Sequence, residues 1–190
     1  CGAHLAESVR KKASKALREQ LYLPKGEHTT ILVAISGGKD SAVLLERIHE
    51  NLGNRRDVTI VGGCVDEGIE GYRPPSLECA RELCEELGIR FETVSYPELG
   101  FKEMDEVVDK IVELEERKAP CSYCGVFRRQ GINHLANRVN ADVIALGHNL
   151  DDMAQTIMMN MQNGDLERTL RLAPHTSTPL EGMVPRIVPL

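Results

Sequence analysis

The chain has 190 residues, of which 42% are hydrophobic and 27% are charged, so we expect one soluble globular domain with a substantial apolar core. No apolar run reaches the roughly 20 residues of a membrane span and no signal-peptide pattern opens the chain, which predicts a cytoplasmic protein with no membrane partner. The formal charge of −6 argues weakly against a nucleic-acid partner for the chain as a whole.

The chain opens with a basic stretch that is expected to be helical. Its cations fall at near-helical spacing, at Arg10, Lys11, Lys12, Lys15 and Arg18. The plain interpretation of such a run is a solvated helix face.

Residues 30–35 (TILVAI) form a continuous apolar run that predicts a buried strand, and residues 36–41 (SGGKDS) follow it before a helix that reaches about Leu52. The two glycines allow a tight turn whose N–H groups approach an anion, and Lys39 and the helix N-terminus add positive charge. Asp40 is a candidate ligand of a phosphate-bound Mg²⁺ ion, or a helix cap. The loop is not a Walker A motif, because Asp40 follows the lysine where that motif has Ser or Thr.

Apolar strands and helices then alternate along the chain. We expect strands at 58–65, 90–96 and 142–146, and helices at about 74–87, 98–120 and 126–140, with a methionine-rich helix ending near Gly164. The prolines of the last stretch predict a loop-like or extended segment. This order implies an α/β fold in which helices cover both faces of a parallel sheet. Residues 36–41, 66–73 and 147–152 each follow a strand, so they should share the ligand-binding edge of the sheet.

Five of the six cysteines divide into two classes. We interpret Cys64, Cys79 and Cys84 as thiols of the core, because they fall in a predicted strand and helix. The close pair Cys121 and Cys124 instead suggests metal or redox chemistry.

Four strings together resemble a known family. SGGKDS looks like the signature of the PP-loop superfamily of ATP pyrophosphatases, which have an adenine nucleotide alpha hydrolase-like domain and transfer AMP to a substrate oxygen. VDEGIEGYR (65–73), CSYCGVFRR (121–129) and GHNLDDMA (147–154) resemble the tRNA 2-thiolation group of that superfamily, and in particular the NcsA-type wobble-uridine thiolases of archaea and eukaryotes.

The resemblance implies an activity and a nucleotide site. ATP with Mg²⁺ would adenylate the C2 oxygen of uridine, and sulfur transfer would then give 2-thiouridine. The implied nucleotide-binding residues are Ala34, Ser36, Gly37, Gly38, Lys39, Asp40, Ser41, Asp66, Gly147 and Asp152. For Asp152, a first-turn helix acid is the alternative interpretation, and for His148 a local hydrogen-bond partner.

The resemblance also assigns Cys121, Cys124 and Arg128 to the catalytic centre, together with Asp40. The cysteine pair would hold a [4Fe–4S] cluster with a third cysteine that is expected beyond Leu190. A persulfide on one cysteine and a structural zinc half-site are the alternatives. Arg128 would steady phosphate or substrate charge, while Arg129 would contact RNA backbone or simply face solvent.

The termini carry further expectations from the family. Residues 1–20 are expected to be a remnant of an N-terminal zinc finger, with Cys1 and His4 as zinc ligands, followed by the basic helix; residues 21–190 would be the PP-loop domain without its C-terminal part. Two ligands alone would leave the zinc tetrahedron half empty.

The implied partners are tRNA, a sulfur donor such as sulfide or a ubiquitin-like carrier, and a second copy or a related subunit in a dimer. Two other functions compete with thiolation: another PP-loop tRNA-modifying ligase, such as a lysidine-forming or amide-forming enzyme, and a non-catalytic subunit that binds tRNA or a sulfur carrier.

Overall fold

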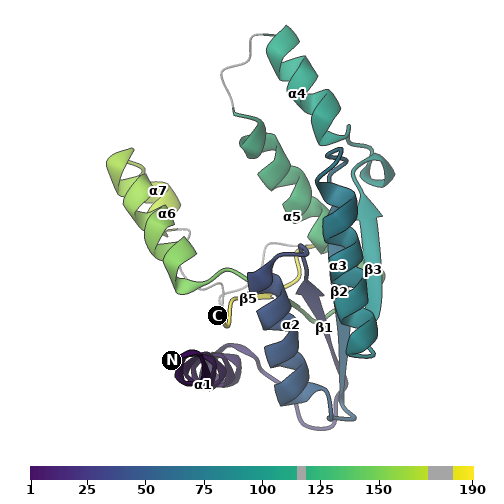
Figure 1. The fold of residues 1–190 in the computed structure, drawn as a ribbon, viewed down its shortest axis with the longest axis vertical. Coiled ribbons are helices and arrows are strands. Elements are labelled where there is room, and N and C mark those ends of the chain that lie inside the picture. Colours follow the sequence, from purple (N-terminus) through teal and green to yellow (C-terminus); the bar gives the residue numbers. More distant parts are fainter. Residues whose placement is uncertain (115–118, 171–181) are drawn as a thin grey trace.

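The computed structural model describes residues 1–114, 119–170 and 182–190, and its centre is a parallel sheet (Figure 1). The sheet has five strands in the order β3-β2-β1-β4-β5. The strands are β1 (Thr29–Ala34), β2 (Val58–Asp66), β3 (Arg90–Ser95), β4 (Val143–Ala145) and β5 (Arg186–Ile187). The helices are α1 (Gly2–Gln20), α2 (Lys39–Leu52), α3 (Arg73–Glu86), α4 (Met104–Glu113), α5 (Pro120–Arg138), α6 (Leu150–Gln162) and α7 (Leu166–Leu170), with a short 3-10 helix η1 (Pro97–Leu99).

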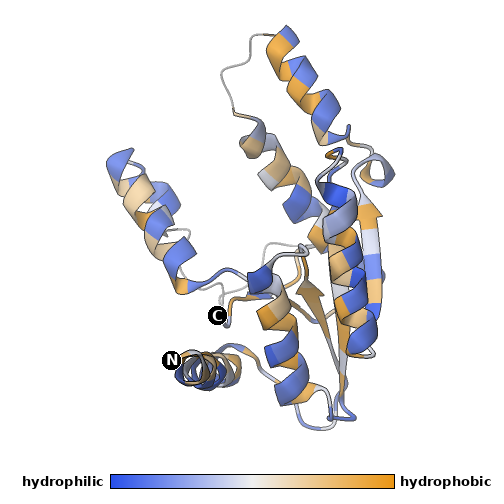
Figure 2. Cartoon of the chain, in the orientation of Figure 1, coloured by the Kyte–Doolittle hydropathy of each residue, from blue (hydrophilic) through white to orange (hydrophobic). Residues whose placement is uncertain are grey.

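Helices cover both faces of the sheet, as the alternation of strands and helices predicts. On one face, side chains from α1, α2 and α3 pack against alternate residues of β1, including Ile31 and Val33. On the other face, Leu32 of β1 packs in a second cluster with side chains of α4 and α5. All three of these β1 side chains are fully buried, which explains why a central parallel strand is a continuous apolar run. Figure 2 shows this run as hydrophobic colour along β1, whereas the helices carry hydrophilic residues on their outer sides.

Proline and glycine set the limits of several helices. Two prolines lie in the first turn of α3, and Pro120 lies in the first turn of α5, where a missing N–H costs no hydrogen bond. Gly88 follows α3 with a φ of 65°, which ends that helix in the left-handed region.

The structure corrects some of the predicted boundaries. α5 begins at Pro120 rather than near residue 126, so the cysteine pair lies in its first turns. α4 spans only part of the range 98–120, of which residues 115–118 lie outside the described part of the chain. The last stretch, expected to be loop-like or extended, contains the short strand β5, whose pairing with β4 is not predicted by the sequence.

One predicted core residue is also corrected. Cys64 and Cys84 are buried, as predicted, but Cys79 is exposed on α3. Tyr96, an aromatic residue in a chain with few of them, is fully buried. Among the described residues, no helix is both long and apolar enough to span a bilayer.

Candidate functional site

The loop of residues 36–41, which we call the nucleotide loop, joins the carboxyl end of β1 to α2. Its backbone is tied to the neighbouring strand by a hydrogen bond from Ile35 N to Gly63 O of 2.8 Å. Gly38 is the N-cap residue of α2, and no side chain caps the amide groups of the first turn. These amides, with the helix dipole, form the kind of site that binds phosphate.

The shape of the nucleotide loop is held by its own serines and requires a glycine at position 37. Ser41 Oγ donates to Gly38 O at 2.9 Å and accepts from Ser36 N at 3.2 Å. Gly37 has a φ of +81°, and a Cβ placed on it would lie 2.2 Å from the backbone oxygen of Ser76 at the start of α3. The absence of a side chain therefore lets the nucleotide loop approach the α3 backbone.

The charged residues of the nucleotide loop lie in the first turn of α2. The ammonium group of Lys39 is 3.0 Å from the carboxylate of Asp40, and the Lys39 side chain is 86% exposed. An exposed ion pair of this kind is weak, so both groups are available to phosphate and metal.

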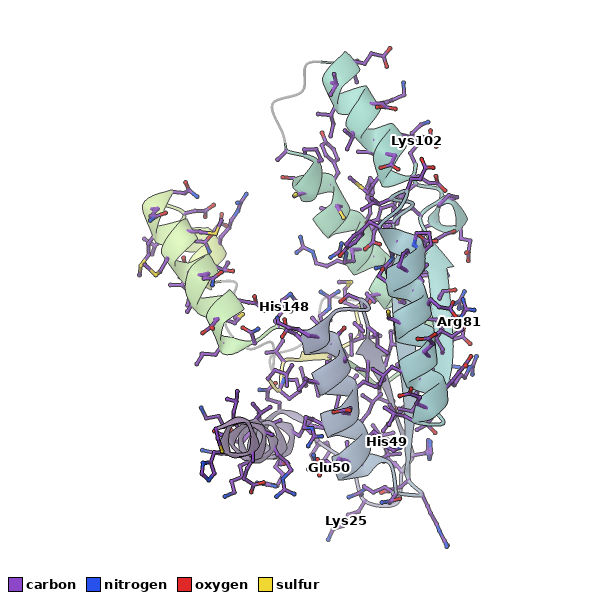
Figure 3. All side chains as sticks on the ribbon, in the orientation of Figure 1. Lys25, His49, Glu50, Arg81, Lys102 and His148 are labelled. Atoms are coloured by element: carbon purple, nitrogen blue, oxygen red, sulfur yellow. The ribbon has the colours of Figure 1, made fainter. Side chains whose placement is uncertain are left out.

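The other predicted nucleotide-binding residues follow neighbouring strands. Gly147 follows β4 closely, and a Cβ placed on it would lie 3.2 Å from Ser41 N, so it abuts the start of α2. His148, the next residue, lies near the same end of α2 in Figure 3 and is exposed. Asp66, at the end of β2, accepts a hydrogen bond from Gly68 N at 3.0 Å.

Asp152 has a structural role in the first turn of α6. Its carboxylate accepts from Asn149 N and its own N–H donates to Asn149 Oδ1, both at 3.0 Å, which forms a capping box. The helix-cap interpretation therefore describes the structure, and one carboxylate oxygen carries the cap.

The cysteine pair lies in the first turns of α5. Cys121 is exposed and Cys124 is partly buried. A spacing of three residues places the two thiols on one side of the helix, near its N-terminus.

A buried carboxylate connects the cysteine pair to the nucleotide loop. We call this set of contacts the carboxylate bridge: Glu67 Oε1 is 2.9 Å from Arg128 Nη2, and Glu67 Oε2 is 2.7 Å from Arg73 Nε. Arg128 Nη2 also donates to Cys124 Sγ at 3.5 Å, and Arg73 Nη1 donates to Ser36 O at 3.3 Å. The bridge therefore runs from the nucleotide loop to a thiol.

The charges of the carboxylate bridge stabilise one another. Burial alone would lower the pKa of Arg128, but the attraction to Glu67 and to Cys124 raises it by more. The pKa of Arg128 is therefore above its ordinary value. The hydroxyl of Tyr96 also lies 3.4 Å from Cys124 Sγ and donates to the carbonyl of Cys124 at 3.2 Å. Burial, followed by the contact with Cys124, raises the pKa of Tyr96 well above its usual value, so Tyr96 is a neutral hydrogen-bond donor.

Two cysteines cannot complete a cluster site by themselves. Within residues 1–114, 119–170 and 182–190, no group of three or more Cys, His, Asp or Glu side chains is arranged to bind a metal ion. Cys121 and Cys124 therefore fit as two ligands of a cluster but do not make up the whole set. Cys1 and His4 are also adjacent, with Sγ and Nδ1 3.6 Å apart, and they too provide only half of a zinc site.

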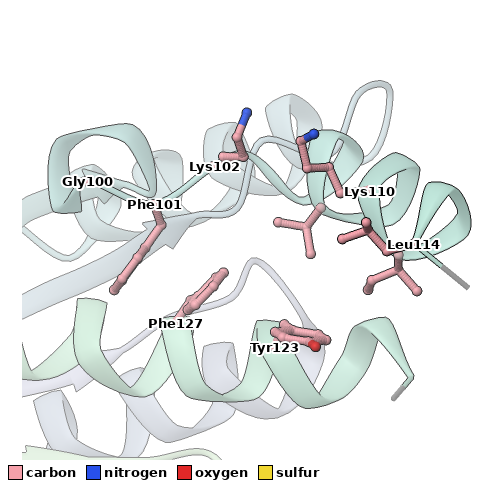
Figure 4. Close-up of a pocket in the computed structure, with 9 residues that line it drawn as sticks. Gly100, Phe101, Lys102, Lys110, Leu114, Tyr123 and Phe127 are labelled. Atoms are coloured by element: carbon pink, nitrogen blue, oxygen red, sulfur yellow. The ribbon is translucent and has the colours of Figure 1, made fainter. Parts of the chain in front are cut away.

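A hollow of 370 Å³ lies between α4 and the start of α5 (Figure 4). Its floor includes the stacked rings of Phe101 and Phe127, whose centroids are 4.3 Å apart. Lys102 and Lys110 border it, and each pairs with a glutamate on α4. None of its lining residues belongs to the nucleotide loop, so we do not assign ATP to it.

Three residues of the site, Glu67, Arg73 and Tyr96, have no clear signal in the sequence. Glu67 lies inside the string 65–73, for which a role is predicted only at Asp66, and no local pattern pairs it with Arg128. Tyr96 is expected only as the end of a strand. It directly follows β3, and its contact with α5 is not visible in a sequence pattern.

Known proteins share both the family and the fold of this chain. The PP-loop domain family matches residues 5–184. The "tRNA 2-thiolation protein NcsA" of Haloferax volcanii is 39% identical over 175 residues, which cover 90% of this chain and 54% of that protein. The "Cytoplasmic tRNA 2-thiolation protein 1" of Danio rerio is 40% identical over 164 residues, or 85% of this chain and 46% of that protein.

A solved structure is similar over the full length of this chain. The "U34-tRNA thiolase NcsA from Methanococcus maripaludis with its [4Fe-4S] cluster" matches with a TM-score of 0.82 and 34% identity, covering 100% of this chain and 60% of that one. This chain thus spans about half the length of the curated relatives it matches.

Proposed function

This chain belongs to the PP-loop family of ATP-binding domains, and we propose that it acts as a tRNA-uridine 2-sulfurtransferase that makes 2-thiouridine at the wobble position. The names of the relatives support this proposal, since curated proteins and a solved structure similar to the chain are tRNA thiolation proteins. The observation that carries it is the carboxylate bridge. It links a phosphate-binding loop to a cysteine thiol, which are the two sites that adenylation and sulfur transfer require.

In the first step, the C2 oxygen of uracil attacks the α-phosphorus of ATP and pyrophosphate leaves. The amides at the start of α2, with Gly37, Gly38 and Ser41 shaping the loop, bind the pyrophosphate as its charge develops. Lys39 adds a full positive charge at the same end of the helix. The product is a uridine whose C2 oxygen carries AMP.

In the second step, sulfur at the cysteine pair attacks C2, and AMP leaves with the former oxygen. Adenylation is required because a carbonyl oxygen is a poor leaving group, whereas AMP is a good one. The sulfur arrives at the oxidation level of sulfide, so the C2–O bond breaks as the C2–S bond forms. Cys121 and Cys124 would hold the group that delivers this sulfur, and Arg128 places a positive charge beside Cys124. A wobble base lies in a single-stranded loop, so it reaches the site with little unpairing.

Mg²⁺ fits the carboxylate of Asp40. Magnesium is usually held by one or two carboxylates together with substrate phosphates, and Asp40 lies in the first turn of α2 beside the phosphate-binding amides. When bound, the metal would neutralise charge on the leaving pyrophosphate. We propose that four further residues contact or position the nucleotide: Ala34, Asp66, Gly147 and Asp152.

For the metal centres, we propose the cysteine pair as two ligands of an iron–sulfur cluster, the group that the similar thiolase of Methanococcus maripaludis carries. A further ligand would have to come from outside the described residues. Zinc at Cys1 and His4 has the same requirement.

The proposed partners follow from the reaction. The basic face of α1 is proposed to contact the tRNA backbone, and a groove beside it, between α1 and α2, is bordered by Arg10, Lys11, Lys15 and Arg18. Sulfide or a ubiquitin-like carrier would supply sulfur, in a cytoplasmic protein that forms a dimer with itself or with a related subunit. Residues 1–20 would be the end of a zinc finger plus this basic helix, and residues 21–190 the PP-loop domain.

The proposal is tested by nucleoside mass spectrometry of tRNA incubated without oxygen with the protein, ATP, Mg²⁺ and sulfide. We expect wobble 2-thiouridine from the wild type and none from the variant Cys121→Ser/Cys124→Ser, while AMP and pyrophosphate still form. The matched control is Cys79→Ser, which removes an exposed thiol on α3 and should leave thiolation intact. Release of AMP and pyrophosphate by the wild type without any 2-thiouridine would instead favour another PP-loop ligase, and thiolation that survives loss of the pair would remove both cysteines from sulfur transfer. Failure of the wild type to release AMP and pyrophosphate would favour a non-catalytic subunit.

A further inference from the structure

We propose that Glu67 is a positioning residue of this site: its buried carboxylate holds the Arg128 guanidinium against Cys124 and fixes that contact relative to the nucleotide loop through Arg73. The inference rests on the proposed function for its chemical meaning, but its geometry stands separately. Glu67 is only 2% exposed, and each of its two oxygens faces a different arginine.

The inner arginine is firmly fixed. Arg73 is 4% exposed and donates to backbone carbonyls at the ends of two strands, at Ser36 after β1 and at Val65 in β2. It also donates to Cys64 Sγ at 2.8 Å. Arg73 Nε lies 2.7 Å from Glu67 Oε2 but outside hydrogen-bond geometry, so this contact is a charge contact and not a directional bond. Arg73 therefore provides a rigid anchor for the carboxylate.

The outer arginine depends on Glu67 for its orientation. The Arg128 side chain is 54% exposed, and a long exposed arginine has many rotamers of similar energy. Its Nη2 atom contacts both Glu67 Oε1 and Cys124 Sγ. Because the carboxylate is held from behind by Arg73, it selects the rotamer that places the positive charge beside the thiol.

The backbone of Glu67 is fixed as well. Its carbonyl accepts from Met104 N at 2.8 Å, which ties the residue to the start of α4. A buried carboxylate is favourable only when it is paired, and here it is paired twice. Asp at this position would keep the charge but shorten the side chain by one methylene, so it could no longer reach both arginines.

The position of the Arg128 charge is measurable from the alkylation of Cys124. Iodoacetate and iodoacetamide both react with the thiolate, but iodoacetate is an anion and is attracted by a nearby guanidinium. Both alkylation rates depend equally on the amount of Cys124 thiolate, so this amount drops out of their ratio. The ratio of the iodoacetate rate to the iodoacetamide rate therefore reports the charge near Cys124. Peptide mass spectrometry measures it at Cys124 in a Cys121→Ser background.

The variants separate positioning from a simple change of charge. Arg128→Gln should lower the iodoacetate preference about threefold, as expected for the loss of a unit charge a few ångströms away in partly hydrated surroundings. Glu67→Asp, with no change of charge, should lower it by most of that factor. Glu67→Gln removes a negative charge, so a fixed Arg128 would raise the ratio, whereas release of Arg128 removes a positive charge as well and cancels that rise. The control Glu70→Gln removes the same charge from an exposed residue of the same segment and should change the ratio little.

Each result for the Glu67 variants supports or overturns the proposal. A ratio that is unchanged in Glu67→Asp, or that rises in Glu67→Gln, overturns it in variants whose circular dichroism shows a folded protein. Should both Glu67 variants fail to fold, Arg128→Gln decides: it leaves the buried pair in place, and an unchanged ratio shows that Arg128 does not stand at Cys124.

Thiolation measured on the same proteins separates this proposal from the proposed function. If the ratios respond as expected and no 2-thiouridine forms with the wild type, the positioning stands and the function fails. If 2-thiouridine forms and the ratios do not respond, the function stands and the positioning fails.

Discussion

Replacing Gly37 by alanine tests whether the nucleotide loop must touch the α3 backbone. Two separate costs arise at this position. Alanine at a φ of +81° is strained by about 1 kcal/mol. Its Cβ would also lie 2.2 Å from Ser76 O and 2.8 Å from Ser76 C, which are backbone atoms that cannot rotate away.

The clash adds a second cost, because either the nucleotide loop or the start of α3 must move. Overpacking of this kind costs about 1–3 kcal/mol, so the sum is about 2–4 kcal/mol. For a chain of this size, each kcal/mol lowers Tm by about 2–4 °C, which predicts a decrease of about 4–16 °C. Any shift of the loop also displaces the phosphate-binding amides, so ATP affinity should fall with stability.

Differential scanning calorimetry and ATP binding by isothermal titration provide the measurement. Gly38→Ala is the matched control, since Gly38 has a φ of −92° and its Cβ would meet only Ser36 Oγ at an ordinary 3.4 Å. We expect Gly38→Ala to change Tm by only a few degrees. If Gly37→Ala has the same Tm as the wild type, or if the two variants lose the same amount of stability, the close approach to Ser76 does not constrain the loop.

Contacts in other parts of the chain lead to three more predictions. Asn149→Ala removes the N-cap of α6 and should cost about 1 kcal/mol in chemical denaturation, and a variant as stable as the wild type would show that the capping box contributes nothing. Burial raises the pKa of Cys64 and of Cys84 to about 11 from 9.0, so the folded protein holds these two protons more tightly than the unfolded chain does. Their contribution to the free energy of unfolding is complete below pH 9 and is lost as the pH rises towards 11. Denaturant unfolding curves measured over that pH range should show the decline. Lys11→Glu/Lys15→Glu should weaken tRNA binding and reduce its salt dependence, by a slope of about 1 for each lost phosphate contact, and binding indifferent to both would remove α1 from the interface.

The strands and the nucleotide loop could be predicted because their signals are local. A buried parallel strand is an apolar run, as at residues 31–33, and a phosphate loop is a short string of glycines beside a helix start. β5 could not be predicted, because Arg186–Ile187 is too short to show a period and is a strand only through its pairing with β4. The prediction that Pro120 ends a helix is wrong, because proline is equally suited to the first turn of a helix, and it begins α5.

The site shows the same division. The nucleotide loop and the cysteine pair are recognisable as strings, but the carboxylate bridge joins β2, α3 and α5. Glu67 and Arg128 are far apart in the sequence, and only the fold brings them into contact. The exposure of Cys79 could not be predicted, because an amphipathic helix with a weak pattern does not specify which cysteine faces inward.

The order of strands in the sheet has a consequence for synthesis on the ribosome. β1 lies at the centre, yet its partner β4 begins at Val143, and the outer neighbour of β4 is made only at Arg186. At a synthesis rate of roughly 5–20 residues per second, the edge of β4 that pairs with β5 stays unpaired for about 2–8 s. α1 is made first, but the two hydrogen bonds between the Gln20 side chain and the Val188 backbone form only after Val188 has been made. A nascent chain thus carries an unpaired edge on β4 until β5 emerges, and we expect chaperones to act on it in that interval.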